Sequence, residues 1–405
     1  MKRIVSVTAV FLCGISLLQA QPVRVSETLK ELEMENISVV EKRDTITAAF
    51  ETSAYRGIYN GIGIAIRHLV AIPEIPTLQL LILDNALPQL CITIPAELIQ
   101  KYQAGECALD EVYRKMGMTT STETAVRQLK GVKRKESSFG KVDFVIYPNV
   151  MLVNNVTYKL YKAALDLQPA LEMQLWKGAS LRMQVSLPIV SNEDGKWNCV
   201  RLGFMALCQD FRLANYWKGY LTGGSFSNDR QGLAAGIGYF SANGRWTVEG
   251  GGGITGSSHF YGSDWKMSKW KRVNGQISVG YYVPEVNTLV KVEGARFIYG
   301  DYGVRGTLSR YFGEYIVGIY GMYTDGATNA GFNFSIPLPG KKRRRHLLRV
   351  MLPEYFAFQY DMRSGNEYAH RSLGESYNTE PRSVENSRFW QPDHIRYYLI
   401  RTSEN

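Results

Sequence analysis

An alternation of polarity with a period of two, from Gly232 to Val283, constrains this chain more than any other feature of its sequence. Side chains of a strand point to opposite faces, so each run presents one apolar face and one small or polar face. The turn signal Asn243-Gly244 separates two of the runs. Several long strands of this kind are typical of a transmembrane β-barrel, in which the apolar face meets lipid and the polar face lines a wet interior. The apolar positions are Leu233, Ala235, Ile237, Tyr239, Trp246, Val248, Ile254, Ile277, Val279, Tyr281 and Val283.

The same alternation extends to both sides of this region. Two runs joined by Trp176-Lys177-Gly178 carry charged residues on one face, which would face the core of a soluble sandwich but face water in a barrel. We expect an antiparallel barrel of about twelve strands, because bacterial barrels usually close on an even number. Pro148 makes the first strand a weaker prediction, since proline cannot donate to a ladder. Further strand candidates are Val142–Val153, Val200–Leu213, Tyr216–Ser225, Val290–Tyr299, Val304–Tyr311, Tyr315–Tyr323, Gly331–Ile336 and a segment within Leu347–Tyr360.

Residues 1–20 have the pattern of a secretory signal peptide. A basic start is followed by an apolar run that ends before the small residue Ala20. No other stretch holds about 18 consecutive apolar residues, so we expect no membrane-spanning helix in the mature chain.

The remaining chain divides into three parts. Residues 21–135 lack the barrel pattern and predict a small α+β domain with a polar connector, in which Ile58, Ile62 and Ile66 form one face of a helix and Gly61 permits close approach. Residues 140–360 predict the barrel. Residues 361–405 are a polar, aromatic-containing tail without clear periodicity.

Charged residues that alternate with apolar ones are candidates for the lumen. Because they occupy the polar face, we expect them to point away from lipid, either along a ligand path or as pairs inside a plugged interior. These candidates are Glu172, Arg182, Arg245, Glu249, Lys291, Glu293 and Arg305. Aromatic residues near strand ends suit interfacial girdles. They are Tyr281, Tyr282, Tyr299, Tyr302, Tyr311, Phe312, Tyr315 and Tyr323.

The net charge of +10 favours anionic partners. An exported chain rarely meets nucleic acid, so we expect outer-membrane lipid headgroups or an acidic polysaccharide as the counter-charges. Part of the excess lies in Lys341-Lys342-Arg343-Arg344-Arg345, which is either a solvated turn beside the membrane or an anion site.

The chemistry of a catalytic or metal site is weakly represented. Gly250 to Gly253 lacks the Lys-Ser/Thr of a phosphate loop and predicts close strand approach or room in the lumen. Ser257-Ser258-His259 resembles part of a hydrolase site, but no matched acidic or amide partner is identifiable. We therefore expect no catalytic residues, no metal and no cofactor.

Four cysteines follow the leader. An even number in an exported chain permits disulfides, most simply Cys91 with Cys107 and Cys199 with Cys208. The alternative is four buried free thiols.

Four parts of the chain stand out for their sequence, and they are Phe50–Gly57 with Gly61–Gly63, Tyr323–Phe332, Ile336–Pro339 and Phe389–Arg396. These segments resemble the YjbH/GfcD family of exopolysaccharide and capsule-associated outer-membrane proteins. The order of signal, small domain, barrel and aromatic polar tail is also similar. The resemblance implies a non-enzymatic role in polysaccharide export or assembly at the outer membrane, with periplasmic export proteins as partners.

Two other functions remain open at this point, a general oligosaccharide or solute porin and an outer-membrane hydrolase. With an even number of strands and a periplasmic N-terminal domain, the tail after Pro339 is expected in the periplasm. The turn at Asn243-Gly244 is then periplasmic, and Ser257 to Lys271 is an outer loop. In intact cells a label would reach position 263 and not position 364.

Overall fold

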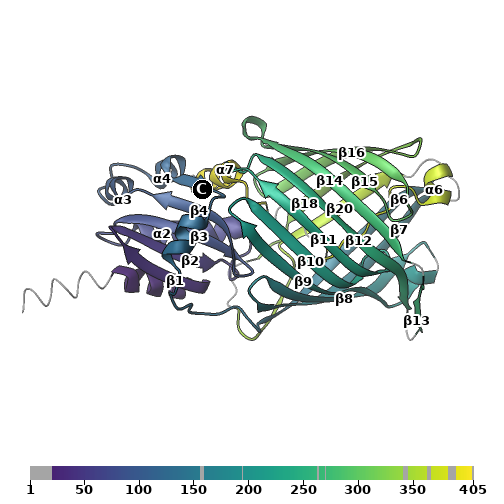
Figure 1. Cartoon of the computed structure of the whole chain (residues 1–405), viewed down its shortest axis with the longest axis horizontal. Helices are drawn as coiled ribbons and strands as arrows, with labels where there is room; N and C mark the ends of the chain where they lie inside the picture. Colours follow the sequence, from purple (N-terminus) through teal and green to yellow (C-terminus); the bar gives the residue numbers. More distant parts are fainter. Residues whose placement is uncertain are drawn as a thin grey trace, which may run out of the picture. The chain divides into compact units, whose positions relative to one another are not determined.

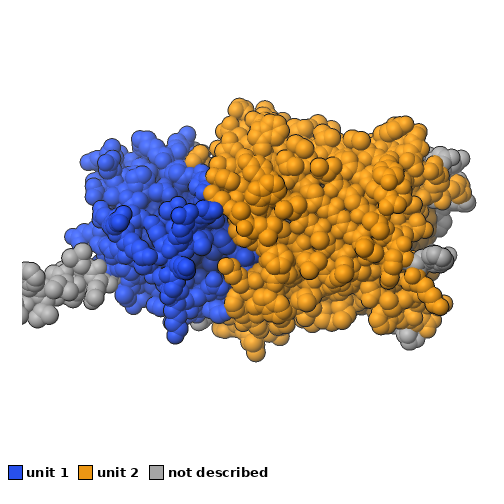
Figure 2. Space-filling model, viewed as in Figure 1, with its two compact units in different colours: residues 1–138, 342–344, 399–405 blue, residues 139–341, 345–398 orange. Residues whose placement is uncertain are grey.

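The computed structural model describes most of the chain from residue 21 onward and divides it into two compact units (Figure 2). Among the described residues, unit 1 holds 21–138 and 399–403, and unit 2 holds 139–340 and 345–398. The predicted leader, Ser263, Trp270, Ser364 and Lys341 to Arg344 lie outside the described residues. The described residues are 21–155, 159–193, 195–261, 264–269, 271–340, 345–362, 366–381 and 389–403.

Unit 1 is the expected α+β domain, built on a five-stranded sheet in the order β1-β2-β3-β4-β5. A helix over residues 21–31, which sequence reasoning missed, precedes the first strand. The predicted helix that carries Ile58, Ile62 and Ile66 on one face is present as α2. The strands are β1 (Glu35–Lys42), β2 (Thr45–Glu51), β3 (Thr77–Asp84), β4 (Leu87–Ile94) and β5 (Gly117–Thr119), and the helices are α2 (Ile58–Val70), α3 (Ala96–Gln103), α4 (Leu109–Lys115) and α5 (Glu123–Gln128).

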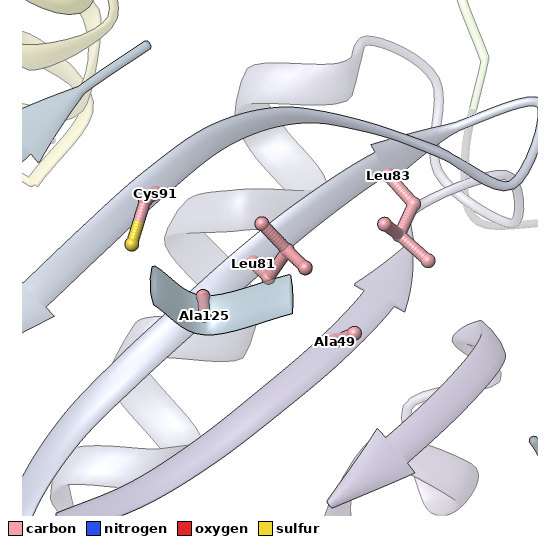
Figure 3. Packing of buried hydrophobic residues seen from close by; sticks show 5 residues of the cluster. All are labelled: Ala49, Leu81, Leu83, Cys91 and Ala125. Atoms are coloured by element: carbon pink, nitrogen blue, oxygen red, sulfur yellow. The ribbon is translucent and has the colours of Figure 1, made fainter. Parts of the chain in front are cut away.

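Apolar side chains hold this sheet on both faces. Ile62 and Ile66 are fully buried on α2, as their spacing predicts. A Cβ at Gly61 would lie 2.5 Å from the Cβ of Thr52, so glycine is required for that close approach. On the α5 side a small cluster packs against the strands (Figure 3), and its members are Ala49, Leu81, Leu83, Cys91 and Ala125.

Unit 2 is a closed barrel of thirteen strands (Figure 1). Each strand pairs antiparallel with its neighbours, except that β6 and β20 close the ring in parallel. The strands are β6 (Val142–Asn155), β7 (Lys159–Trp176), β8 (Ala179–Ser191), β9 (Arg201–Ala214), β10 (Trp217–Phe226), β11 (Arg230–Phe240), β12 (Trp246–Tyr261), β14 (Arg272–Val283), β15 (Thr288–Arg296), β16 (Tyr302–Phe312), β17 (Tyr315–Thr324), β18 (Ala327–Pro337) and β20 (Tyr355–Met362).

The barrel has about the expected number of strands, but the number is odd and not even, and this changes the topology. The segment Leu347–Tyr360 holds two strands, because β19 (Leu348–Met351) and β20 are separate and both lie beside β6. Since β6 and β20 are parallel, both begin at one end of the barrel, here called the proximal end. The chain therefore leaves β20 at the opposite, distal end, whereas an even number would have returned it to the proximal end.

Pro148 fits its strand because of this closure. On the side of β6 where the barrel closes, β19 pairs with Val142 to Val145 and β20 pairs with Leu152 to Asn154. Pro148 lies between these two stretches, so its missing N–H breaks neither parallel ladder.

Since β6 begins at the proximal end, the direction of each later strand assigns every turn to the proximal or the distal end of the barrel. The turn at Asn243-Gly244 joins β11 to β12 at the proximal end. Between β12 and β14, at the distal end, the chain forms a hairpin with β13 (Asp264–Met267) rather than a simple loop. Among the described residues, no helix has the length and apolar character needed to cross a membrane.

The four described cysteines are free thiols, which corrects the disulfide interpretation. Cys208 lies seven residues beyond the distal start of β9, and Cys199 precedes that strand. At about 3.3 Å per residue the two are much farther apart than the roughly 7 Å limit between the Cα atoms of a disulfide. The alternative of four buried thiols is also wrong, since Cys199 is exposed and Cys107 is half-buried.

Candidate functional site in the barrel lumen

The outer face of the barrel is apolar and the inner face is polar. Val279 is 43% exposed, whereas Ser278 beside it on β14 is 4% exposed. The same contrast runs around the strands, so the alternation in the sequence is the alternation between outside and inside. Exposed apolar side chains of the outer face include Leu171, Leu187, Leu207, Leu221, Leu233, Ile237, Val248, Ile254, Val273, Ile277, Val292, Val304, Leu308, Val317, Ile319 and Phe332.

The predicted aromatic girdle is divided between the two faces. Tyr299, Tyr302, Phe312, Tyr315 and Tyr323 are exposed near strand ends, where interfacial residues belong. Tyr282 and Tyr311 instead point inward and are almost fully buried, because they share the parity of the polar positions on their strands.

Two predicted lumen residues form one group on β7 and β8. Glu172 and Arg182 lie directly opposite each other in the ladder. The Glu172 carboxylate accepts a hydrogen bond of 2.5 Å from the hydroxyl of Tyr147. The Arg182 guanidinium is buried and forms an ion pair with Glu380 of the C-terminal tail. A charge on the inner wall is thus neutralised by the tail.

A second group crosses β12, β14, β15 and β16. Glu249, Ser278, Glu293 and Arg305 are successive partners in the ladder. The Lys291 ammonium lies 3.6 Å from the Glu249 carboxylate. The Arg305 guanidinium lies 4.0 Å from the centre of the Tyr320 ring, a cation–π contact with an inward aromatic residue.

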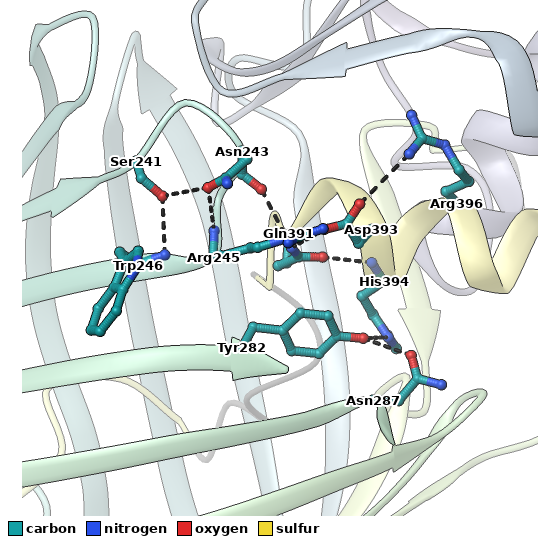
Figure 4. Close-up of polar contacts among 10 residues, drawn as sticks. All are labelled: Ser241, Asn243, Arg245, Trp246, Tyr282, Asn287, Gln391, Asp393, His394 and Arg396. Atoms are coloured by element: carbon teal, nitrogen blue, oxygen red, sulfur yellow. Dashed lines mark hydrogen bonds and ion pairs between the residues drawn. The ribbon is translucent and has the colours of Figure 1, made fainter. Parts of the chain in front are cut away.

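Arg245 stands apart from both groups, at the proximal end just before β12. Its Nε lies 2.7 Å from an Asp393 carboxylate oxygen, so it also contacts the tail (Figure 4). Six of the seven predicted residues lie on the polar face of their strands, and Arg245 lies at the proximal end of the barrel. The structure therefore distributes the seven over three places.

Other buried ion pairs of the inner wall were missed. The Asp166 carboxylate accepts from Arg201 at 2.5 Å, and Asp143 pairs with Arg345 at 3.1 Å and Arg349 at 2.9 Å. Asp166 has the same parity as Glu172 on β7, so extending the alternation by six residues would have found it.

The tail begins at the distal end of the barrel and lies against its inner wall, whereas an even strand number would have placed its start at the proximal end. Helix α6 (Asn366–Arg371) lies at the distal end, where Figure 1 shows it on the same side as β13. The Arg371 guanidinium is 3.3 Å from Asp325 in the distal turn between β17 and β18. Residues 373–381, here called the strap, follow.

Polar contacts hold the strap against the inner wall. The Tyr377 hydroxyl donates to Asn274 on β14 at 3.0 Å, and its ring stacks on Phe226. A Cβ at Gly253 would overlap the Tyr377 hydroxyl, so the glycine run of β12 provides space for the strap. Glu380 then reaches Arg182.

The described tail continues at the proximal end, where an aromatic cluster packs against inward-facing residues of the barrel. Phe389 stacks on Tyr311 with ring centres 4.8 Å apart and meets Tyr282 at 5.5 Å. His394, at the start of α7 (Pro392–Ser403), packs on Tyr311 at 4.7 Å. Burial lowers the pKa of His394 to about 3, so its imidazole is neutral at physiological pH.

Hydrogen bonds fix this segment to the proximal turns (Figure 4). The Gln391 side chain donates to the Asn243 carbonyl at 3.4 Å and accepts from the His394 backbone N–H at 2.5 Å. The Tyr282 hydroxyl donates to the side chain of Asn287 at 2.7 Å. The described tail residues thus lie against the inner wall on the distal side of the lumen and pack against the barrel at its proximal end.

No family model, curated protein or solved structure matches this chain. The geometry of the lumen therefore carries the functional argument.

Ser258 and His259 do not form the nucleophile–base pair that the sequence suggested. Neighbouring residues of a strand point to opposite faces, so these two side chains diverge on β12. Ser258 accepts a hydrogen bond from the Trp265 indole at 2.9 Å, while the His259 ring lies 3.5 Å from Asp229.

Proposed function

We propose that this chain is an outer-membrane β-barrel protein that assists the export or assembly of an exopolysaccharide or capsule, without catalysing a reaction. The continuous apolar outer face supports membrane insertion, since an exposed surface of this size is costly in water. The secretory pattern of the leader supports export from the cytoplasm. The resemblance to the YjbH/GfcD family supports the polysaccharide role.

One observation favours a role in polysaccharide export over the role of an open pore. The strap and the proximal aromatic cluster occupy the lumen that a general porin would leave open to water. A solute porin is for this reason the weaker alternative. Unit 1, proposed to lie in the periplasm, would then meet export proteins or the emerging acidic polymer.

Deletion of the gene in its host, followed by measurement of polysaccharide on the cell surface, tests the proposal. We expect the surface polymer to fall and the full-length chain to restore it. Unchanged surface polymer, together with a steady single-channel conductance of the purified protein in planar bilayers, would favour the porin.

A further inference from the structure

A polar cavity of about 230 Å³ lies in the lumen between the strap and the barrel wall. The wall contributes Tyr220 from β10 and Asn274 and Gln276 from β14, and the strap contributes Tyr377, Thr379 and Glu380. The cavity exists because small residues face inward here. Ala234 lines it, and Gly253 admits the Tyr377 side chain.

Some lining groups are fixed by the protein and others have unused hydrogen-bonding capacity. Tyr377 is held by Asn274, and Glu380 is held by Arg182. Within the described part of the chain, the side chains of Tyr220, Gln276 and Thr379 have no hydrogen-bond partner. These three groups together offer hydroxyl and amide donors and acceptors to whatever fills the cavity.

The chemistry of the lining selects the ligand. The described lining residues include no lysine or arginine, and the one lining carboxylate, that of Glu380, is paired with Arg182, so the lining itself offers no cation that would attract an anion. Convergent neutral polar groups beside an aromatic ring suit a molecule with several hydroxyls on a compact frame. The volume is below the roughly 300–1,000 Å³ of pockets for drug-sized ligands, which limits the ligand to about one ring.

We propose that this cavity binds a single neutral sugar ring, with Gln276, Tyr220 and Thr379 hydrogen-bonding its hydroxyls and the strap completing the site. The inference rests on the proposed function, because it makes the lumen a recognition site for one unit of the polymer. The tail is then part of the binding site and not only a plug.

Titration of the full-length protein in detergent, followed by saturation-transfer NMR, tests the site. The probes are D-glucose, D-galactose, D-mannose and N-acetyl-D-glucosamine, with D-glucuronate and inorganic phosphate as anionic comparisons. We expect saturable binding of at least one neutral sugar. Gln276→Leu and Tyr220→Phe should each raise its Kd about three- to tenfold, the equivalent of one lost hydrogen bond.

Tyr239→Phe is the matched control, because Tyr239 lies on the neighbouring β11 with outward parity. Its Kd should equal that of the wild type, and heat-modifiable gel mobility should show all three variants folded. The proposal is overturned if no neutral sugar binds saturably, if phosphate binds as tightly, or if Tyr239→Phe weakens binding equally. Reduced surface polymer in the gene deletion, with no sugar binding, would leave the proposed function standing and reject this site alone.

Discussion

Replacing Glu51 by Gln should remove a pH dependence from the stability of unit 1. The Glu51 carboxylate, at the end of β2, is buried and accepts hydrogen bonds from the Ala86 backbone N–H at 3.0 Å and from the Asn36 side chain. Burial, with a smaller contribution from the nearby charges of Asp84 and Glu35, raises its pKa to about 7 and together these effects outweigh the two hydrogen bonds.

The sign follows from proton linkage. The folded state binds this proton more tightly than the unfolded state, whose pKa is near 4.5. The stability is therefore fully present below pH 4.5, falls as the pH rises towards 7, and is constant above that. A shift of about 2.5 pKa units at about 1.4 kcal/mol each corresponds to roughly 3 kcal/mol.

Hydrogen–deuterium exchange of peptides from β1 to β4 measures this difference. Comparing wild type and Glu51→Gln at each pH cancels the intrinsic exchange rates. At pH 8 we expect the peptides of Glu51→Gln to be more protected from exchange than those of the wild type. At pH 5 this advantage of the variant over the wild type should be smaller. Glu97→Gln on the exposed first turn of α3 is the control and should show no such change. An equal difference at pH 5 and pH 8 would refute the reasoning.

Three other perturbations test the barrel and its tail. Val279→Arg should cost about 2–4 kcal/mol of unfolding free energy in lipid vesicles, whereas Val279→Leu should cost little; equal costs would mean that β14 faces no lipid. Glu380→Gln removes the ion pair that holds the strap to Arg182 and should speed hydrogen exchange of residues 373–381 about tenfold; unaltered exchange would disprove this. The wild-type protein should show no steady conductance in planar bilayers. Phe389→Ala should conduct intermittently, because the proximal cluster loses its central ring. A steadily open wild type would contradict the idea that the tail blocks the lumen.

The barrel could be predicted because its signal is local. Whether Val279 faces out and Ser278 faces in follows from period-two geometry, and each strand repeats it independently. The same rule places Glu172, Arg182 and Glu249 on the polar face. Tyr282 and Tyr311 were wrongly assigned to the girdle, but the alternation along their own strands places both side chains on the inner face.

The position of the tail could not be predicted because its contacts with the barrel are long-range in sequence. Glu380 and Arg182 are 198 residues apart, and Asp393 and Arg245 are 148 apart. Nothing in the local pattern of the strap indicates a lumen, since it forms neither strand nor helix there. The strand number was expected to be even, although the candidate segment Leu347–Tyr360 already offered a further strand, and that segment supplies β20. Because β20 is the thirteenth strand, the tail leaves the barrel at the distal end and not at the proximal end.

Cysteine labelling of intact cells tests most directly whether the tail leaves the barrel at the distal end. In a Cys199→Ser background, which removes the exposed native thiol, a membrane-impermeant maleimide is applied to two single variants. His370→Cys lies on α6 at the distal end, and Glu285→Cys lies in the proximal turn between β14 and β15. With unit 1 in the periplasm, we predict labelling of position 370 in intact cells and of position 285 only after permeabilisation. Labelling of position 370 only after permeabilisation would contradict the thirteen-stranded topology and the passage of the tail through the lumen.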